Sequence, residues 1–307
     1  MSDLSCDVLG LKLRNPLVLA SGVLGTSPGL LERVAACGAG AVTAKSCGPE
    51  PRAGHANPIS VGWAGGVINA VGLTNPGLQD EVPILKEAKA RLRELGVPLI
   101  ASIFAPSVDE FGRMAAGISE AEPDLIEVNI SCPNVSDDFG TPFSGSPETT
   151  AAVTRKVREN TRIPFTVKLS SNVPSIARIA LAAEDAGAHA ITAINTVPGM
   201  LIEARAASPV LSNRVGGISG WAIKPIALRC VAEIRKAVKL PIIGLGGIST
   251  GQDVAEMIMA GATAVGVGAA VMERGPQVFA LIAQELDDFM NAEHYPNLEK
   301  MRGLAIR

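Results

Sequence analysis

The sequence predicts an α/β protein that folds as a single (β/α)8 TIM barrel over residues 1–307. Short apolar runs alternate strictly with helical patterns, which is typical of a parallel sheet covered by helices. Eight such units in roughly 250 residues match a closed barrel, and the surplus lies in insertions. One local pattern also occurs three times, at Gly38, Gly187 and Gly261, where a helical pattern ends and a strand-like run begins. Glycine suits the left-handed position after a helix, so these corners indicate a repeated β/α unit.

The predicted elements follow one another in regular order along the chain. Apolar runs predict strands near residues 17–20, 41–45, 98–103, 124–129, 163–169, 189–194, 240–244 and 263–267. Helical patterns fill the gaps near residues 28–37, 78–95, 107–120, 148–160, 174–186, 221–238, 250–260 and 276–290. An N-terminal hairpin, residues 6–13, is expected to close the barrel floor. Two long insertions, 46–77 after strand 2 and 196–219 after strand 6, are expected on the carboxyl-terminal face, where lids and substrate loops belong.

The composition favours a soluble, cytoplasmic protein that binds neither nucleic acid nor membranes. The net charge is −3, and no run of Lys or Arg suggests a basic patch. Five scattered cysteines without a C-x-x-C pair support neither a zinc nor an iron–sulfur site and fit a reducing cytoplasm. The N-terminus lacks the basic and apolar regions of a signal peptide. The longest uncharged stretch, residues 257–272, is shorter than a typical membrane span.

Polar residues gather at the predicted carboxyl ends of the strands, where barrel enzymes keep their chemistry. Lys45 and Lys168 end strands 2 and 5, and burying an unpaired ammonium is costly, so both lysines predict anionic or electron-rich partners. The alternative is a solvated lysine at each strand end. Gly246-Gly247 and Gly268 precede helices after strands 7 and 8, where barrels commonly bind phosphate through backbone N–H groups. The same glycines could instead only permit tight turns.

Strand 4 leads into residues 129–134, whose sequence brings two amides, a hydroxyl and a thiol together. Pro133 stops the strand, because proline cannot donate to a central ladder. Cys132 is the one plausible acid–base residue in the polar ring, since His55 and His189 lack an adjacent acid. A thiol accepts a proton only as a thiolate, and the alternative is a buried structural cysteine. A phosphate-anchored cofactor, no metal and a thiol base together suggest a flavin enzyme that removes a proton beside a carbonyl.

Four segments, residues 20–22, 69–77, 129–134 and 216–220, resemble the dihydroorotate dehydrogenase family in the same order and spacing. Residues 219–229 resemble class 1B, the catalytic subunit of the NAD-linked enzyme. A cysteine at position 132 differs from the serine base of the membrane-associated class 2. The resemblance implies an FMN-bearing barrel that oxidises dihydroorotate to orotate in pyrimidine synthesis. It also implies that Cys132 removes the C5 proton while hydride passes from C6 to the flavin N5.

The resemblance implies a role for each matching residue. Lys168 would act with Cys132 in catalysis by stabilising negative charge on the reduced flavin. Amides suit a substrate with imide-like donors and acceptors. Substrate contacts are implied for Lys45, Asn69, Gly72, Leu73, Asn129, Asn134, Asn195 and Thr196. Contacts to the flavin and its phosphate are implied for Ser21, Gly22, Lys45, Ser46, Asn129, Lys168, Gly217, Gly246, Gly247, Gly268 and Ala269.

The electron acceptor is open at the level of the sequence. The chain has no convincing NAD fingerprint and no iron–sulfur ligand set, so NAD as the acceptor requires a partner subunit with FAD and a 2Fe-2S cluster. A homodimer core of a heterotetramer is then expected. The alternatives are a class 1A-like enzyme that uses fumarate or a quinone, and a flavin barrel similar to dihydropyrimidine dehydrogenase. A Schiff-base aldolase built on Lys45 or Lys168 and a non-enzymatic scaffold barrel are the alternatives from other classes.

Overall fold

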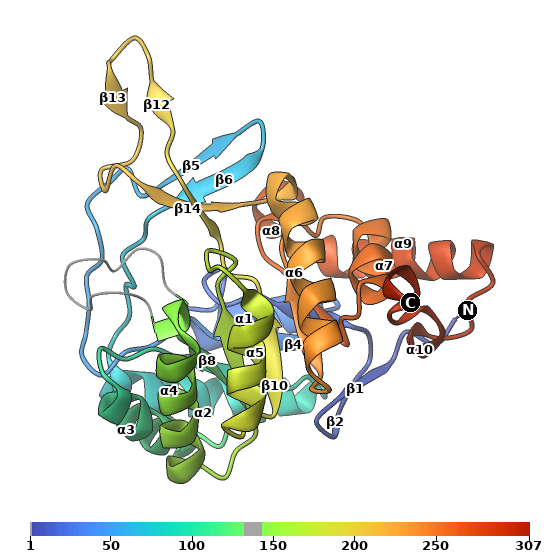
Figure 1. The fold of residues 1–307 in the computed structure, drawn as a ribbon, viewed down its shortest axis with the longest axis horizontal. Coiled ribbons are helices and arrows are strands. Elements are labelled where there is room, and N and C mark those ends of the chain that lie inside the picture. The colour runs from blue at the N-terminus through green and yellow to red at the C-terminus, as the bar shows by residue number, and fades with distance from the viewer. Residues whose placement is uncertain (1, 132–142) are drawn as a thin grey trace.

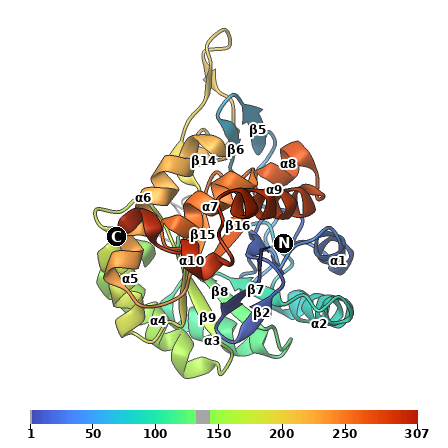
Figure 2. The ribbon, with the colours of Figure 1, turned by 90° about the vertical axis from the view of Figure 1, so that its right-hand side faces the viewer.

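The computed structural model describes residues 2–131 and 143–307. Eight parallel strands close into a barrel in the order β10–β15–β16–β3–β4–β7–β8–β9, with the helices arranged around them (Figure 2). The strands are β3 (Leu17–Leu19), β4 (Ala41–Thr43), β7 (Leu99–Ile103), β8 (Leu125–Asn129), β9 (Phe165–Leu169), β10 (Ala190–Ala193), β15 (Ile242–Leu245) and β16 (Ala264–Val267). Each overlaps one predicted strand, so the predicted (β/α)8 barrel is confirmed.

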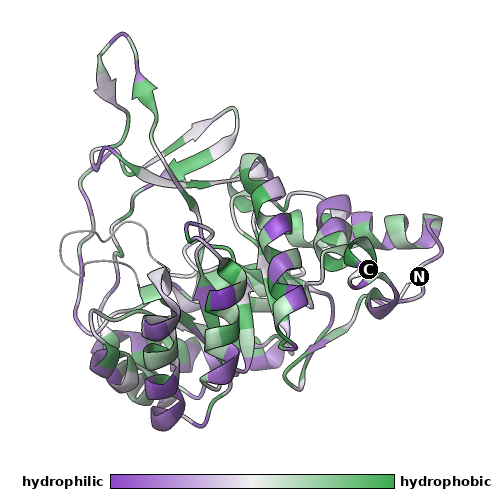
Figure 3. Cartoon of the chain, viewed as in Figure 1, coloured by the Kyte–Doolittle hydropathy of each residue, from purple (hydrophilic) through white to green (hydrophobic). Residues whose placement is uncertain are grey.

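The main helices also lie where the sequence predicts them, and Figure 3 shows hydrophilic and hydrophobic residues sharing the helices that face the viewer. They are α1 (Pro28–Ala36), α2 (Leu78–Glu94), α3 (Val108–Ser119), α4 (Pro147–Asn160), α5 (Ile176–Asp185), α6 (Lys224–Ala237), α7 (Gly251–Met259) and α9 (Val278–Ala292). Five of these helices begin at a residue whose side-chain oxygen accepts a hydrogen bond from a backbone N–H of the first turn. These N-cap residues are Ser27, Ser107, Ser146, Ser175 and Thr250. Within the described ranges, no helix is long and apolar enough to cross a membrane.

Three features of the helices differ from the prediction. The helix predicted to start at residue 221 starts at Lys224, because Trp221–Ile223 forms a 3-10 turn and Pro225 suits the first α-helical turn. Two short helices, α8 (Ala270–Arg274) and α10 (Leu298–Met301), were not predicted. Both are too short to show a helical period in the sequence.

The three repeated corners share one geometry. Gly38, Gly187 and Gly261 follow α1, α5 and α7 with φ angles of 108°, 96° and 116°. In each corner the amide of the next residue donates to the carbonyl five positions earlier, at distances of 3.4, 2.9 and 3.1 Å. This is the hydrogen bond of a Schellman motif, which lets the chain turn directly from a helix into a barrel strand. The predicted positive φ at these glycines is therefore confirmed.

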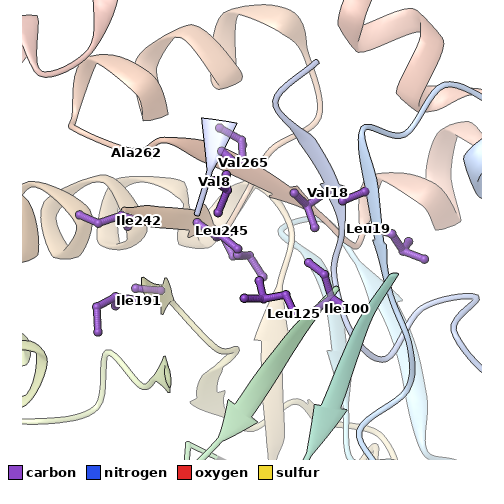
Figure 4. Close-up of a cluster of buried hydrophobic side chains, with 14 of the residues drawn as sticks. Val8, Val18, Leu19, Ile100, Leu125, Ile191, Ile242, Leu245, Ala262 and Val265 are labelled. Atoms are coloured by element: carbon purple, nitrogen blue, oxygen red, sulfur yellow. The ribbon is translucent and has the colours of Figure 1, made fainter. Parts of the chain in front are cut away.

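The core of the barrel is built from branched aliphatic side chains of different strands. Figure 4 shows Val18, Ile100, Ile191 and Ile242 brought into one cluster, and none of them is more than 3% exposed. Val8 of the hairpin β1 (Cys6–Val8) and β2 (Leu11–Leu13) lies in the same cluster. The N-terminal hairpin thus packs onto the barrel core, as the sequence predicts for a floor.

The two long insertions pair with each other, which the sequence did not predict. β5 (Ser60–Trp63) and β6 (Gly66–Asn69) come from the first insertion, and β11 (Val197–Gly199) and β14 (Gly216–Ser219) from the second. They form an antiparallel sheet in the order β11–β14–β6–β5 above the barrel (Figure 1). A further hairpin, β12 (Ile202–Glu203) and β13 (Ser208–Pro209), projects beyond this sheet (Figure 1).

Candidate active site

A pocket of about 440 Å³ lies where the strand ends meet the four-stranded sheet. Residues that follow the barrel strands line most of it, and the sheet contributes Ser60, Val67, Asn69 and Ser219. Both its position and its size are typical of small-molecule and cofactor sites in barrels. Among the residues that the structure describes, no group of three or more His, Cys, Asp or Glu side chains could hold a metal ion.

The pocket gathers most of the predicted site residues. Those lining it are Ser21, Gly22, Lys45, Ser46, Asn69, Gly72, Leu73, Asn129, Lys168, Asn195, Thr196, Gly246, Gly247, Gly268 and Ala269. Gly217 is not among the lining residues. Cys132 and Asn134 lie outside the described residues.

Gly217 lies in β14 directly behind Thr196. A Cβ atom at this position would stand 2.0 Å from the Thr196 Oγ1 atom, which is far inside van der Waals contact. The carbonyl of Gly217 also accepts a hydrogen bond of 3.3 Å from Asn69 Nδ2. The geometry of Gly217 therefore positions two predicted substrate residues, Asn69 and Thr196.

Lys168 is paired inside the barrel with Glu127, a residue that sequence reasoning missed. Their side chains are each only 5% exposed, and Lys168 Nζ lies 3.2 Å from Glu127 Oε1. Lys168 Nζ also donates to Ser21 Oγ at 2.9 Å. The signal for Glu127 was present in the sequence, because a charged residue in the buried run Leu125–Asn129 requires a partner.

Two of the predicted amides, Asn129 and Asn195, are joined through the hydroxyl group of Ser131. Asn195 Nδ2 donates to Ser131 Oγ at 3.0 Å, and Ser131 Oγ donates to Asn129 Oδ1 at 3.0 Å. On its other side, Asn129 Nδ2 donates to Ser46 Oγ at 3.3 Å. Ser46 Oγ lies 2.8 Å from Ser102 Oγ. The backbone N–H of Ser131 also donates to Asn129 Oδ1 at 3.3 Å, and because an N–H can only donate, this contact identifies the oxygen of the Asn129 amide.

The glycine loops after β15 and β16 offer backbone to the pocket. A Cβ atom at Gly247 would lie 2.8 Å from the backbone nitrogen of Lys224, so the loop packs closely against α6. A Cβ atom at Gly268 would find only Ala20 Cβ, at 3.6 Å, and would fill open space beside the pocket. The open backbone at Gly268, just before α8, fits the phosphate of a cofactor.

Three buried thiols are unsuited to act as bases. Burial raises the pKa of Cys6 and of Cys47 to about 12, and nearby Glu81 adds to the effect at Cys47. Burial likewise raises the pKa of Cys230 to about 11. These three side chains therefore stay protonated near neutral pH and have structural roles.

Glu81 is a buried carboxyl group on the Lys45 side of the barrel. It lies in the first turn of α2 and is 4% exposed. Burial raises its pKa from 4.5 to about 7, and the positive charge of Lys45 opposes this shift. Because the folded protein binds this proton more tightly than the unfolded chain, the protein is stabilised below pH 4.5 and loses that stability as the pH rises to 7.

We expect the substitution Glu81→Gln to increase the free energy of unfolding at pH 8 by about 3 kcal/mol, since 2.5 pKa units correspond to that energy. At pH 4.5 the variant and the wild type should differ little. Denaturant unfolding at both pH values checks this. Glu94→Gln, the same change at the exposed end of α2, is the control and should show no such difference. Equal stability changes at the two pH values would refute the role of Glu81.

The fold and the pocket define the class of protein: a (β/α)8-barrel enzyme with its site at the carboxyl ends of the strands. The family model described as dihydroorotate dehydrogenase matches residues 3–290. The chain therefore belongs to the dihydroorotate dehydrogenase family, a family of oxidoreductases, and this membership implies a flavin.

Several relatives are similar to the chain over nearly its whole length. The catalytic subunit of dihydroorotate dehydrogenase B (NAD(+)) from Methanosarcina mazei is 44% identical over 305 residues, which cover 99% of this chain and 96% of that protein. The protein of the same name from Methanothermobacter thermautotrophicus is 43% identical over 306 residues, or 98% of each chain. The one from Pyrococcus abyssi is 41% identical over 304 residues, or 99% of each chain. The words "catalytic subunit" imply that these relatives act with a separate subunit.

Proposed function

We propose that this chain is the catalytic barrel of an NAD-linked dihydroorotate dehydrogenase and oxidises (S)-dihydroorotate to orotate with FMN. The observation that carries the proposal is that one pocket gathers both strand-end lysines, three amides and the two glycine loops. The near full-length similarity to subunits of that name supports it.

The amides and Lys45 are proposed to bind the substrate. Asn69, Asn129 and Asn195 reach the pocket from the sheet and from two strand ends. Their side chains offer the donors and acceptors that suit a ring with imide groups. Lys45, which lines the same pocket, supplies a positive charge for a substrate carboxylate.

Other residues that line the pocket are proposed to hold FMN. Bound FMN would supply the hydride acceptor. The backbone of Gly246, Gly247, Gly268 and Ala269 would hold the phosphate, and Ser21, Gly22 and Ser46 would contact the rest of the cofactor. The ammonium of Lys168 would favour negative charge on the isoalloxazine.

Cys132 is proposed as the base that takes the C5 proton from the substrate. It follows the pocket residue Asn129 by three positions and lies outside the described residues. A thiolate is required for this role, and the buried thiols Cys6, Cys47 and Cys230 are held protonated by burial. Cys37, the remaining thiol, does not line the pocket, so we assign proton removal to Cys132.

The narrow space behind Thr196 yields a prediction about substrate binding. Gly217→Ala should displace Thr196 and raise the KM for dihydroorotate about tenfold, the equivalent of one hydrogen bond. Steady-state kinetics and flavin content are measured together. Gly62→Ala in β5, where a Cβ meets nothing within 4 Å, is the matched control and should behave as wild type. A loss of flavin with an unchanged KM would instead support the cofactor role implied for Gly217.

The electron acceptor is proposed to be NAD, reached through a partner subunit that carries FAD and a 2Fe-2S cluster. Two barrels and two such subunits would form the assembly. Dihydroorotate-dependent NADH formation should appear only when the purified barrel is mixed with that subunit. Rapid reduction of fumarate or a quinone by the barrel alone would contradict the NAD-linked assignment.

Mass analysis of the flavin released from the barrel should give FMN, and FAD alone would refute that cofactor.

A further inference from the structure

Glu127 is a buried carboxylate that the proposed reaction does not use directly. Its Oε1 atom accepts hydrogen bonds from Ser21 Oγ at 2.9 Å and from Ser102 Oγ at 3.0 Å. The same oxygen accepts a charged hydrogen bond from Lys168 Nζ at 3.2 Å. Three donors on one oxygen stabilise a negative charge that would otherwise be costly inside the barrel.

The contacts between Glu127, Lys168 and Ser21 close a triangle. Ser21 Oγ accepts a hydrogen bond from Lys168 Nζ, so its own hydroxyl proton points to Glu127. The ammonium is thus held from two sides by oxygen atoms that belong to β8 and to the end of β3. Lys168 and Ser21 both line the pocket, and Glu127 holds them from behind.

The second branch that ends on Glu127 also has one direction. Because Ser102 donates its hydroxyl proton to Glu127, its oxygen is left to accept a hydrogen bond from the Ser46 hydroxyl. Ser46 in turn accepts a hydrogen bond from the Asn129 amide. Asn129 accepts from the Ser131 hydroxyl, which accepts from the Asn195 amide. Every proton of this chain points toward Glu127, so its negative charge favours the amide orientation seen at Asn129.

We propose that Glu127 is a positioning residue of the flavin site, which holds the Lys168 ammonium in place and balances its charge. The two side chains act as one unit that sets the reduction potential of the bound flavin. Glu127 acts through Lys168, the residue expected to lie against the cofactor. This inference rests on the proposed function for the identity of the bound group.

Glu127→Gln is the direct test, because glutamine keeps the size and one acceptor oxygen but removes the charge. The pair then changes from neutral to positive, which favours the reduced, anionic flavin. Titration against a redox dye should show the equilibrium shifted at least tenfold toward reduced flavin, about 30 mV for a two-electron couple. Glu94→Gln on the exposed end of α2 is the control and should leave the potential unchanged. An unchanged or lowered potential in Glu127→Gln would overturn the proposal.

A second measurement needs no flavin and therefore separates this inference from the proposed function. In flavin-free protein, Glu127→Gln and Lys168→Met should each lower the unfolding midpoint, because each leaves one buried charge without its partner. The double variant has no charge in the pair and should recover most of the loss, whereas additive losses would overturn the pairing. If Glu127→Gln alone does not fold, a folded double variant still supports the unit, and an unfolded one refutes it. Failure of the wild-type protein to bind any flavin would count against the proposed function alone.

Discussion

Replacing Cys132 by alanine is expected to slow the reduction of bound flavin by dihydroorotate by about 10²–10⁴-fold, the usual contribution of a positioned acid–base group. The variant should keep its flavin, because Lys168, Ser21 and the glycine loops proposed to hold the cofactor come from other strand ends. Anaerobic stopped-flow absorbance, which follows the flavin bands during a single turnover, measures this step without the partner subunit.

The chain offers a matched control for this experiment. Cys230 lies in α6, is buried, and has its pKa raised to about 11 by that burial. Cys230→Ala removes a thiol of the same size and should reduce its flavin at the wild-type rate. Wild-type flavin reduction in Cys132→Ala would show that another group takes the C5 proton.

Replacing Lys168 by methionine is expected to have the largest effect on both stability and cofactor binding. The substitution leaves Glu127 without its cation in a site that is 5% exposed, which should lower the free energy of unfolding by about 3–5 kcal/mol. Loss of the contact proposed between the Lys168 ammonium and the flavin should weaken binding of the proposed cofactor FMN by roughly tenfold or more. Denaturant unfolding of the flavin-free protein and titration with FMN measure the two effects separately.

Lys224→Met is the matched control for the lysine substitution. Lys224 also forms ion pairs, with Asp253 and Glu256, but its side chain is 25% exposed and its partners stay partly solvated. The control should therefore lose little stability. Equal losses in the two variants would contradict the account of Lys168 as half of a buried pair.

The barrel was predictable because its signals are local. Short apolar runs marked the eight strands, and the three glycine corners after α1, α5 and α7 showed the repeated unit. The polar ring was predictable for the same reason, since parallel strands bring their carboxyl ends to one face. Lys45, Asn129 and Lys168 were placed at strand ends by sequence position alone, and the structure brings them into one pocket.

What the sequence did not reveal depends on contacts between distant residues. β6 and β14 pair Asn69 with Gly217, and no local pattern in either short strand identifies that partner. The sequence shows Glu127 as a charged residue in an apolar strand. Its partner, Lys168, lies on β9 and could be identified only once the order of the barrel strands was known. Only the three-dimensional structure therefore shows how Lys168 and Thr196 are held in position.

The most direct test of the proposed function is anaerobic addition of dihydroorotate to the purified barrel while its visible spectrum is recorded. We expect flavin bands in the isolated protein and bleaching of those bands by one equivalent of dihydroorotate per flavin. Dihydrouracil, which lacks the carboxylate proposed to meet Lys45, should leave the bands unchanged. Flavin bands that persist with dihydroorotate but bleach with a chemical reductant would contradict the assignment of this pocket to dihydroorotate oxidation.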